Sequence, residues 1–481
     1  MKFALAPYPT YKDSGIPWLG EVPEHWEVRR IKTLFHEKDE RSNNRTGLLL
    51  SLTRAQGIVP QGEASSRLAS AEDLSKYKVC RPGDLVMNRM QAWSGMFSLS
   101  SYEGLVSPDY SVFGTVGGAK VKYFEHLFKS PCFVDQFARQ SKGIGSGFNR
   151  LYTPDFGAIH FLVPPVAEQA AIVKFLDYMD RRIRRYVSAK KKLIKLLEGQ
   201  KQAIIQRAVT RGLDPDVILK PSGVESLGEV PVHWDVRRLR NTAEMRVSNV
   251  DKLTNDDEDS VRLCNYVDVY KNDRITDQIS FMRATATFDE IERFRLKIGD
   301  VLITKDSEAW NDIGIPSLVE YSASDLVCGY HLALLRPHGK LLTGSYGFYA
   351  LQIPSIAYQF HIRANGVTRF GLSQNSIKDV IIPLPPLPEQ AAIVRFLDDA
   401  TANIDATISR TKQEISLLNE YRTRLIADVV TGKLDVREAA TRLPDEQIES
   451  ELLDEENTPM VDDEFESSER DLDGELEEVE T

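Results

Sequence analysis

The sequence predicts an α+β protein built from two tandem mixed α/β domains, each followed by one long helix, with an acidic tail at the end. Three observations predict this fold class: an internal repeat, short β-rich runs in each half, and a long stretch of helical periodicity that closes each half. The chain has 481 residues, of which 42% are hydrophobic and 27% charged, enough for two or three globular domains.

Two pairs of matching segments carry the repeat. Residues 14–32 and 222–240 share 12 of 19 residues, including Gly-Glu-Val-Pro-x-His-Trp. Residues 164–177 and 385–398 share 11 of 14, including Pro-Pro-x-x-Glu-Gln. The helical pattern after each Pro-Pro has the same length in both halves, whereas the variable block before it is 13 residues longer in the second half. A constant helix behind two diverged blocks predicts a spacer between two differently adapted domains.

The first matching segment repeats a His-Trp pair in each half. Trp26 and Trp234 are expected to anchor the next element against the domain. His25 and His233 lack carboxylates or cysteines at metal-ligand spacing, so we interpret both as packed structural residues.

Each half then shows short runs typical of β-strands, divided by Gly and Pro. Gly83-Asp84 and Gly299-Asp300 are predicted to form matching turns that lead into strands, and helices are predicted at 121–139 and 346–363. The predicted strands lie at 48–52, 81–87 and 105–113 in the first half, and at 261–264, 297–303 and 326–335 in the second.

The two closing segments place apolar residues at steps of three, four and seven, which is the stripe of an amphipathic helix. Each Pro-Pro marks a helix start, because Pro is tolerated in the first turn. A helix of 42 residues extends about 63 Å. So long a stripe needs a partner, and the other copy is the obvious one, packed as a coiled coil. The residues expected to pair are Ile172, Phe175, Met179, Ile183, Ile393, Phe396, Ile404 and Ile408.

The net charge of −11 is unevenly distributed. From residue 444 to 481 the sequence holds 18 acidic residues and one basic residue, Arg470, so this tail is predicted to be disordered. The preceding residues carry 59 basic and 53 acidic groups, a net of +6. We interpret the tail as a solubilising appendage, and the alternative is a phosphate mimic that competes for a basic groove.

The first long helix is more basic than the second, with 12 Lys and Arg against 4 acidic residues from Glu168 to Arg211. A solvated surface and a side that faces DNA phosphates or an acidic partner are equally open interpretations.

No pattern predicts catalysis, a metal site or a bound cofactor. The sequence holds no GxxxxGK[ST] loop, no Asn-Pro-Pro-Tyr or Asp-Pro-Pro-Tyr, and no paired cysteines at zinc spacing. No apolar stretch approaches the roughly 20 residues of a membrane helix, and the N-terminal segment lacks the sustained apolar core of a signal peptide. A cytoplasmic location is therefore expected.

The paired Gly-Glu-Val-Pro-x-His-Trp segments, the paired Pro-Pro-x-x-Glu-Gln helix starts and the Gly-Asp turn in each variable block resemble the specificity subunit of type I restriction–modification systems. The resemblance implies two target recognition domains, each reading one half of an asymmetric, split DNA target. It also implies that the long helices form an antiparallel pair, related by a pseudo-twofold, which sets the gap between the half-sites near one DNA turn, about 34 Å. The expected boundaries are 1–166 and 218–387 for the recognition domains, 167–211 and 388–433 for the spacer helices, and 444–481 for the tail, which has no counterpart in the family pattern.

The resemblance implies partners as well. Double-stranded DNA, two methyltransferase subunits docked on the helices and domains, and restriction subunits are expected to bind. S-adenosylmethionine, ATP and Mg²⁺ are expected on those partner subunits, and no cofactor on this chain.

Base contacts favour Arg, Lys, Asn and Gln. Loops that offer such residues are 88–93 and 145–150 in the first domain, and 304–310 and 366–369 in the second. The residues predicted to contact DNA are Asn88, Arg89, Gln91, Arg150, Lys305 and Arg369. For Trp93 and Trp310, core packing is preferred over stacking on bases.

Two other function classes compete with this interpretation. A self-sufficient nuclease or methyltransferase with degenerate motifs would modify or cut DNA by itself. A helical adaptor whose lobes bind proteins would give no sequence-selective protection of DNA.

Overall fold

The computed structural model describes residues 5–43, 47–54, 56–64, 74–116, 119–143 and 149–444. The acidic tail predicted from residue 444 lies outside the described residues from 445 onward, and so do residues 145–148 of the first candidate glycine loop. The chain divides into two compact units. Unit 1 comprises Met1–Val187 and Ser416–Thr481, and unit 2 comprises Ser188–Ile415.

Unit 1 contains a mixed α/β domain whose central sheet has four strands in the order β4-β11-β8-β9. Its elements are β1 (Tyr11–Asp13), β2 (Glu21–Pro23), β3 (Glu27–Arg30), η1 (Ile31–Thr33), β4 (Phe35–Glu37), β5 (Leu50–Thr53), β6 (Gly57–Pro60), α1 (Gln61–Ala64), β7 (Lys78–Cys80), β8 (Leu85–Asn88), η2 (Ala92–Ser94), β9 (Phe97–Leu99), β10 (Gly104–Val106), β11 (Tyr110–Thr115), α2 (Val121–Phe128), α3 (Pro131–Gln140), α4 (Thr153–Ala158), β12 (His160–Val163) and α12 (Arg437–Thr441).

Unit 2 contains a second mixed α/β domain, with a five-stranded sheet in the order β16-β24-β20-β22-β18. Its elements are β13 (Leu219–Pro221), β14 (Glu229–Pro231), β15 (Asp235–Arg238), η3 (Leu239–Asn241), β16 (Ala243–Val247), β17 (Asp259–Cys264), α6 (Tyr266–Lys271), β18 (Arg274–Ile275), β19 (Met282–Ala286), α7 (Phe288–Phe294), β20 (Val301–Thr304), β21 (Asp306–Ser307), β22 (Pro316–Val319), β23 (Leu326–Cys328), β24 (Leu332–Pro337), α8 (Gly344–Gln352), α9 (Pro354–His361), β25 (Asn365–Gly366), β26 (Phe370–Gly371), α10 (Gln374–Lys378) and β27 (Ile381–Leu384).

The two units share a pattern of strand pairing. In unit 1, β3 pairs antiparallel with β12, and β8 pairs antiparallel with β11. In unit 2, β15 pairs with β27 and β20 pairs with β24 in the same sense. The internal repeat in the sequence therefore corresponds to a repeat in topology.

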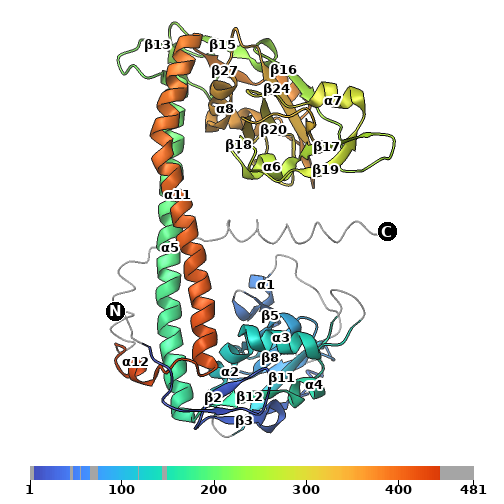
Figure 1. Cartoon of the computed structure of the whole chain (residues 1–481), viewed down its shortest axis with the longest axis vertical. Helices are drawn as coiled ribbons and strands as arrows, with labels where there is room; N and C mark the ends of the chain where they lie inside the picture. The colour runs from blue at the N-terminus through green and yellow to red at the C-terminus, as the bar shows by residue number, and fades with distance from the viewer. Residues whose placement is uncertain are drawn as a thin grey trace. The chain divides into compact units, whose positions relative to one another are not determined.

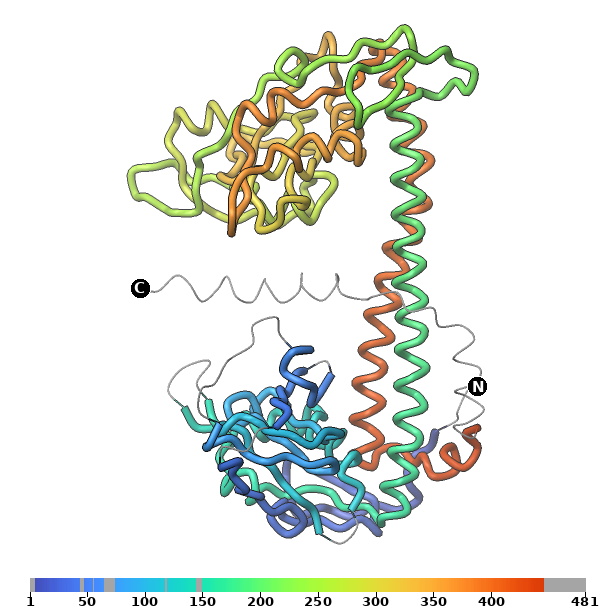
Figure 2. The backbone as a smooth tube through the Cα atoms, turned by 180° about the vertical axis from the view of Figure 1, so that it is seen from behind, coloured from blue at the N-terminus to red at the C-terminus, as the bar shows by residue number. Residues whose placement is uncertain are grey.

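Two long helices, α5 (Val166–Arg211) and α11 (Leu387–Val430), contribute to both units. Within each unit, a portion of α5 lies alongside a portion of α11 (Figures 1 and 2). In unit 2, Lys190 pairs with Glu414, and Lys201 Nζ lies 2.8 Å from Asp405 Oδ1. Residue numbers rise along one helix as they fall along the other, so the two helices run antiparallel.

Left-handed glycines follow both long helices. Gly212 has a φ of +74° and Gly432 a φ of +81°, conformations that glycine adopts without strain. A Cβ on Gly432 would lie 2.5 Å from Pro23 Cδ, and one on Gly212 would lie 3.3 Å from Trp234. Because the chain turns sharply here, α11 ends at Val430 and not at residue 433.

The Gly-Asp turns predicted before two strands are confirmed. Gly83 and Gly299 have φ values of 90° and 88°, and strands begin two residues later, at Leu85 and Val301. The carboxylates of Asp84 and Asp300 are almost fully buried, and each accepts a hydrogen bond from a backbone N–H three residues earlier. The helical patterns predicted at 121–139 and 346–363 each form two helices, because Pro131 and Pro354 open a new helix in each.

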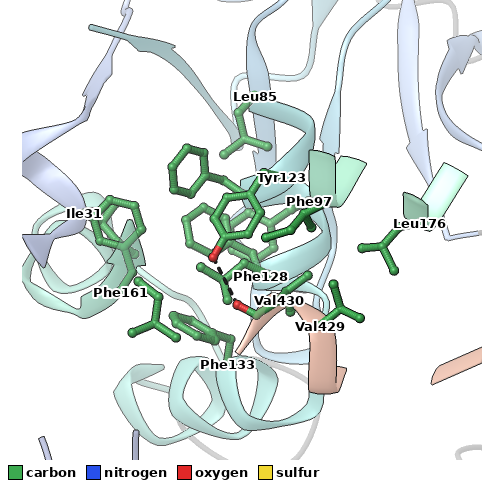
Figure 3. Close-up of a cluster of buried hydrophobic side chains, with 14 of the residues drawn as sticks. Ile31, Leu85, Phe97, Tyr123, Phe128, Phe133, Phe161, Leu176, Val429 and Val430 are labelled. Carbon is green, nitrogen blue, oxygen red and sulfur yellow. Dashed lines mark hydrogen bonds between the residues drawn. The ribbon is translucent and has the colours of Figure 1, made fainter. Parts of the chain in front are cut away.

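Aromatic side chains dominate the core of unit 1. Phe97, Phe128, Phe133 and Phe161 surround Tyr123, whose hydroxyl donates to the Val430 carbonyl of α11 at 3.0 Å (Figure 3). Because this bond satisfies the only polar group of a fully buried ring, it fixes the end of α11 against the domain.

The expected anchoring role of the repeated tryptophans is confirmed, since Trp26 and Trp234 are fully buried. Trp26 Nε1 donates to Glu168 Oε1 at 2.9 Å, and Tyr8 donates to the same oxygen at 2.5 Å. His25 Nε2 lies 2.7 Å from the other carboxylate oxygen. In this way the start of α5 is tied to the first matching segment.

Candidate nucleic-acid interface

The residues predicted to contact DNA lie where the central strands end. Arg89 follows β8 in unit 1, and Lys305 follows β20 in unit 2. These strands occupy equivalent places in the two sheets, because β8 pairs antiparallel with β11 and β20 pairs antiparallel with β24. In both units a third segment, just before α4 or α10, completes the cluster.

In unit 1 the structure brings two separately predicted loops together. Arg89 Nε donates to the Asp109 carbonyl at 2.8 Å, and its Nη2 donates to the Pro108 carbonyl at 3.0 Å. The Asp109 carboxylate lies 3.5 Å from Arg89 Nη2 and 3.7 Å from Arg150 Nη2. The Leu151 N–H donates to the Arg89 carbonyl at 3.0 Å, which ties the second loop to the first.

Asn88 and Gln91 stabilise the same loop from within. Asn88 Nδ2 donates to Gln91 Oε1 at 3.0 Å, and Asn88 Oδ1 accepts from the Met90 N–H at 3.1 Å. Both amides therefore have internal partners, although Gln91 is exposed. A base could compete for the remaining amide donors and acceptors.

Unit 2 has the corresponding arrangement with different side chains. Lys305 Nζ donates to Asp306 Oδ2 at 2.6 Å, and the Leu372 N–H donates to the Lys305 carbonyl at 2.8 Å. Arg369 is exposed in the turn between β25 and β26, with its Nη2 3.3 Å from His331 Nε2. Thus Lys305 and Arg369, predicted from separate loops, also lie in one cluster.

The clusters differ in how charge is held. Burial alone would raise the pKa of Asp306, but hydrogen bonds from Lys305 and His331 outweigh it and lower that pKa. The lowered pKa favours the ionised form of Asp306 beside Lys305, and Arg369 contacts His331 in the same cluster. In unit 1, Asp109 stands between two arginines. Each cluster keeps a net positive charge, which suits a phosphate-rich ligand.

Sequence reasoning missed Asp109, Asp306 and His331. Asp109 and His331 each precede a central strand, so they approach Arg89 and Lys305 only through strand pairing. The register of that pairing carries no local signal in the sequence.

The preference for core packing of Trp93 and Trp310 is wrong. Trp93 is 37% exposed and Trp310 is 51% exposed. Trp93 lies on the 3-10 turn η2. Its indole N–H donates to the Met90 carbonyl of the same loop at 2.9 Å, which holds the ring on the loop surface. Both rings lie on the segments that carry Arg89 or Lys305, and the Trp310 ring also packs edge-to-face against His361.

The residues expected to pair the helices fall into several groups. Ile172 and Phe175 are buried in the core cluster of unit 1 that also contains Leu425 and Val429 of α11, and Met179 packs against that cluster. Ile183 is buried as well.

In unit 2, Ile393 belongs to a core cluster with Ile205 of α5, and Ile404 and Ile408 cluster with Ile194. The prediction that Phe396 pairs the helices is wrong, because its side chain is 44% exposed. The buried position at this turn of α11 is taken by Leu397, four residues after Ile393.

None of the helices in the described ranges is long and apolar enough to cross a membrane. Among the same residues, no group of three or more His, Cys, Asp or Glu is placed to hold a metal ion.

Comparisons with known proteins point to one family. The family model of the type I restriction modification DNA specificity domain matches residues 231–417. The chain is 21% identical over 459 residues to the EcoKI specificity subunit of Escherichia coli K12, covering 86% of this chain and 90% of that protein. It is 21% identical over 444 residues to the StySPI specificity subunit of Salmonella potsdam, with the same coverage.

A specificity subunit from Methanocaldococcus jannaschii is 25% identical over 206 residues, but the chain spans only 47% of its length. A chain from a structural study of complex assembly and conformational transition in the type I R-M system has the same fold. It aligns with a TM-score of 0.60 at 18% identity, covering 86% of this chain and 99% of that one. Over most of its length the chain is therefore similar in sequence and fold to specificity subunits of type I restriction–modification systems.

Proposed function

We propose that this chain reads a bipartite, asymmetric DNA target, with one half-site read by the recognition domain of each unit. One observation carries the proposal. In both units the cluster comes from three equivalent segments, which are the loop after β8 or β20, the residue before β11 or β24, and the segment before α4 or α10, but the side chains differ. Arg89, Asp109 and Arg150 form one cluster, whereas Lys305, His331 and Arg369 belong to the other. Equivalent positions predict equivalent docking, and different donors and acceptors predict different bases.

We further propose that the recognition domains extend over about residues 1–166 and 218–387, and that the long helices act as an antiparallel coiled-coil spacer. The apolar contacts of Ile194 with Ile404 and Ile408 support this role, as do the ion pairs along the helices. A helical spacer resists bending better than a loop, so it would hold the unread gap of the DNA target at a fixed length.

Two methyltransferase subunits are proposed to dock on repeat-related surfaces of the helices. Leu196 and Leu417 occupy the same position in the repeated segments, and they are 64% and 63% exposed. Exposed leucines at matching positions suit two copies of one partner. Restriction subunits would join through that core complex. S-adenosylmethionine, ATP and Mg²⁺ would be used on the partner subunits, with no cofactor on this chain.

The test is co-expression of this chain with a methyltransferase subunit from the same restriction–modification system, in a host without DNA methylation, followed by genome-wide mapping of modified adenines. The expected result is one split, asymmetric motif. A soluble co-purifying complex that methylates no defined motif would overturn the proposal, and so would methylation or cleavage by the purified chain alone.

Docking has its own readout. L196D and L417D should each weaken co-purification of the methyltransferase subunit, and the double variant should abolish it. K195Q, a change at an exposed neighbour on α5, is the matched control and should leave co-purification intact.

A further inference from the structure

His331 occupies a strained position beside the candidate interface of unit 2. Its φ is +64°, a conformation that residues other than glycine seldom adopt and that clusters at functional sites. Its carbonyl accepts a hydrogen bond from the Lys305 N–H at 2.9 Å. The equivalent position in unit 1 is Asp109, because the next residues, Tyr110 and Leu332, begin equivalent strands.

The hydrogen bonds of His331 determine its tautomer. Nδ1 lies 2.7 Å from Asp306 Oδ2, and an ionised carboxylate only accepts, so Nδ1 carries the proton. Nε2 lies 3.3 Å from Arg369 Nη2, and a guanidinium only donates, so Nε2 presents a lone pair. Together these contacts favour the tautomer with the proton on Nδ1, which leaves a hydrogen-bond acceptor, Nε2, facing Arg369.

Both sides of the ring are held. Tyr330 packs on His331 with ring centroids 3.8 Å apart, and Asp306 is fixed by Lys305 and by the pairing of β21 with β26. Arg369, in contrast, is exposed on the short turn between β25 and β26. The acceptor is thus preorganised, and the donor that covers it is a solvent-exposed side chain.

We propose that His331 is a specificity-determining residue of unit 2, whose Nε2 accepts a hydrogen bond from the exocyclic amine of adenine or cytosine in the major groove. Asp306 is the positioning residue that holds the acceptor tautomer. This inference rests on the proposed function and deepens it. Arg369 leaves His331 when DNA binds and contacts a phosphate or a neighbouring base.

The chemistry predicts which bases are rejected. Adenine N6 and cytosine N4 are donors at the edge of the major groove, whereas guanine O6 and thymine O4 are acceptors there. An acceptor on the protein facing an acceptor on the base leaves both unpaired in a desolvated contact. One position of the half-site read by unit 2 should therefore be adenine or cytosine on the contacted strand.

The experiment compares methylation motifs of the wild-type complex with those of H331F, H331Q and D306A. H331F removes the acceptor and should relax one position of one half-site, with modification of guanine- and thymine-containing sites rising about tenfold relative to wild type. H331Q keeps an acceptor and should retain the base preference. D306A should relax the same position more weakly, because the ring loses its fixed tautomer.

Unit 1 supplies the control. D109N changes the equivalent position and should affect only the other half-site. An unchanged motif in H331F, beside a split motif for the wild type, would overturn this inference and leave the proposed function standing. Equal loss of modification on all sequences in H331F and H331Q would mean a purely structural role and would overturn it too. Absence of any split motif in the wild type would sink the proposed function itself.

Discussion

At the scale of single residues, the repeat contains matched positions with different surroundings. Glu168 and Glu389 occupy the same place after Pro-Pro, at the start of the long helices. Glu168 is nearly buried and binds Tyr8, His25 and Trp26. Glu389 is more exposed and pairs with His233, while Trp234 Nε1 has no partner among the described residues.

Removing the first carboxylate should therefore cost more than removing the second. E168A leaves the buried Tyr8 hydroxyl and Trp26 indole unpaired, so it should lower the free energy of unfolding by about 2–4 kcal/mol. E389A, which loses a half-exposed pair with His233, should cost about 1 kcal/mol or less. Urea unfolding followed by tryptophan fluorescence measures both, and equal losses would contradict the assigned hydrogen bonds.

Asp306 should make stability depend on pH. Its pKa is lower in the folded chain than the ordinary value of about 3.9, so its contribution is present above that value and is lost as pH falls through the lowered pKa. The difference in unfolding free energy between wild type and D306N should shrink as the pH is lowered from about 5 to about 2, a range that includes the ordinary Asp pKa of about 3.9. A difference that stays constant over this range would show that Lys305 and His331 do not stabilise the carboxylate.

Residue types could be predicted at this scale, but their neighbours could not. Arg89, Arg150, Lys305 and Arg369 are predicted to contact DNA because Arg and Lys in loops after strands suit that role, and this stays a prediction. His331 was missed, because its role depends on a left-handed backbone and on pairing between distant strands. Neither property follows from local composition.

At the scale of elements, the sequence predicted the helices better than the strands. Pro-Pro starts and a long apolar stripe define α5 and α11 within a few residues, because both signals are local. The stripe alone did not decide which neighbouring residue faces the partner. Phe396 and Leu397 are both apolar, and only the rotation of the packed helix buries Leu397.

Pairing of the helices gives a prediction with a built-in control. I404A removes part of the buried cluster with Ile194 and Ile408 and should lower the unfolding free energy by about 2 kcal/mol. F396A, at an exposed position of the same helix, should change it by no more than about 0.5 kcal/mol. Thermal unfolding compares the two variants. A larger loss of unfolding free energy in F396A than in I404A would mean that the Phe396 ring packs in the helix interface.

At the scale of the whole molecule, the repeat supports the proposal that one chain reads two different half-sites. The parts that match in sequence are residues 14–32 and 222–240 at the start of each half and the beginnings of the long helices. These matching parts join each domain to its long helix. The parts that diverge hold the two charged clusters. Duplication followed by divergence of one block thus predicts independent recognition by the two units.

The most direct test of that independence exchanges residues 218–387 for the corresponding block of another specificity subunit and maps the methylated motif. The account predicts that one half-site changes while the other half-site and the gap between them stay the same. A change in both half-sites, or an unchanged motif in an active complex, would contradict it.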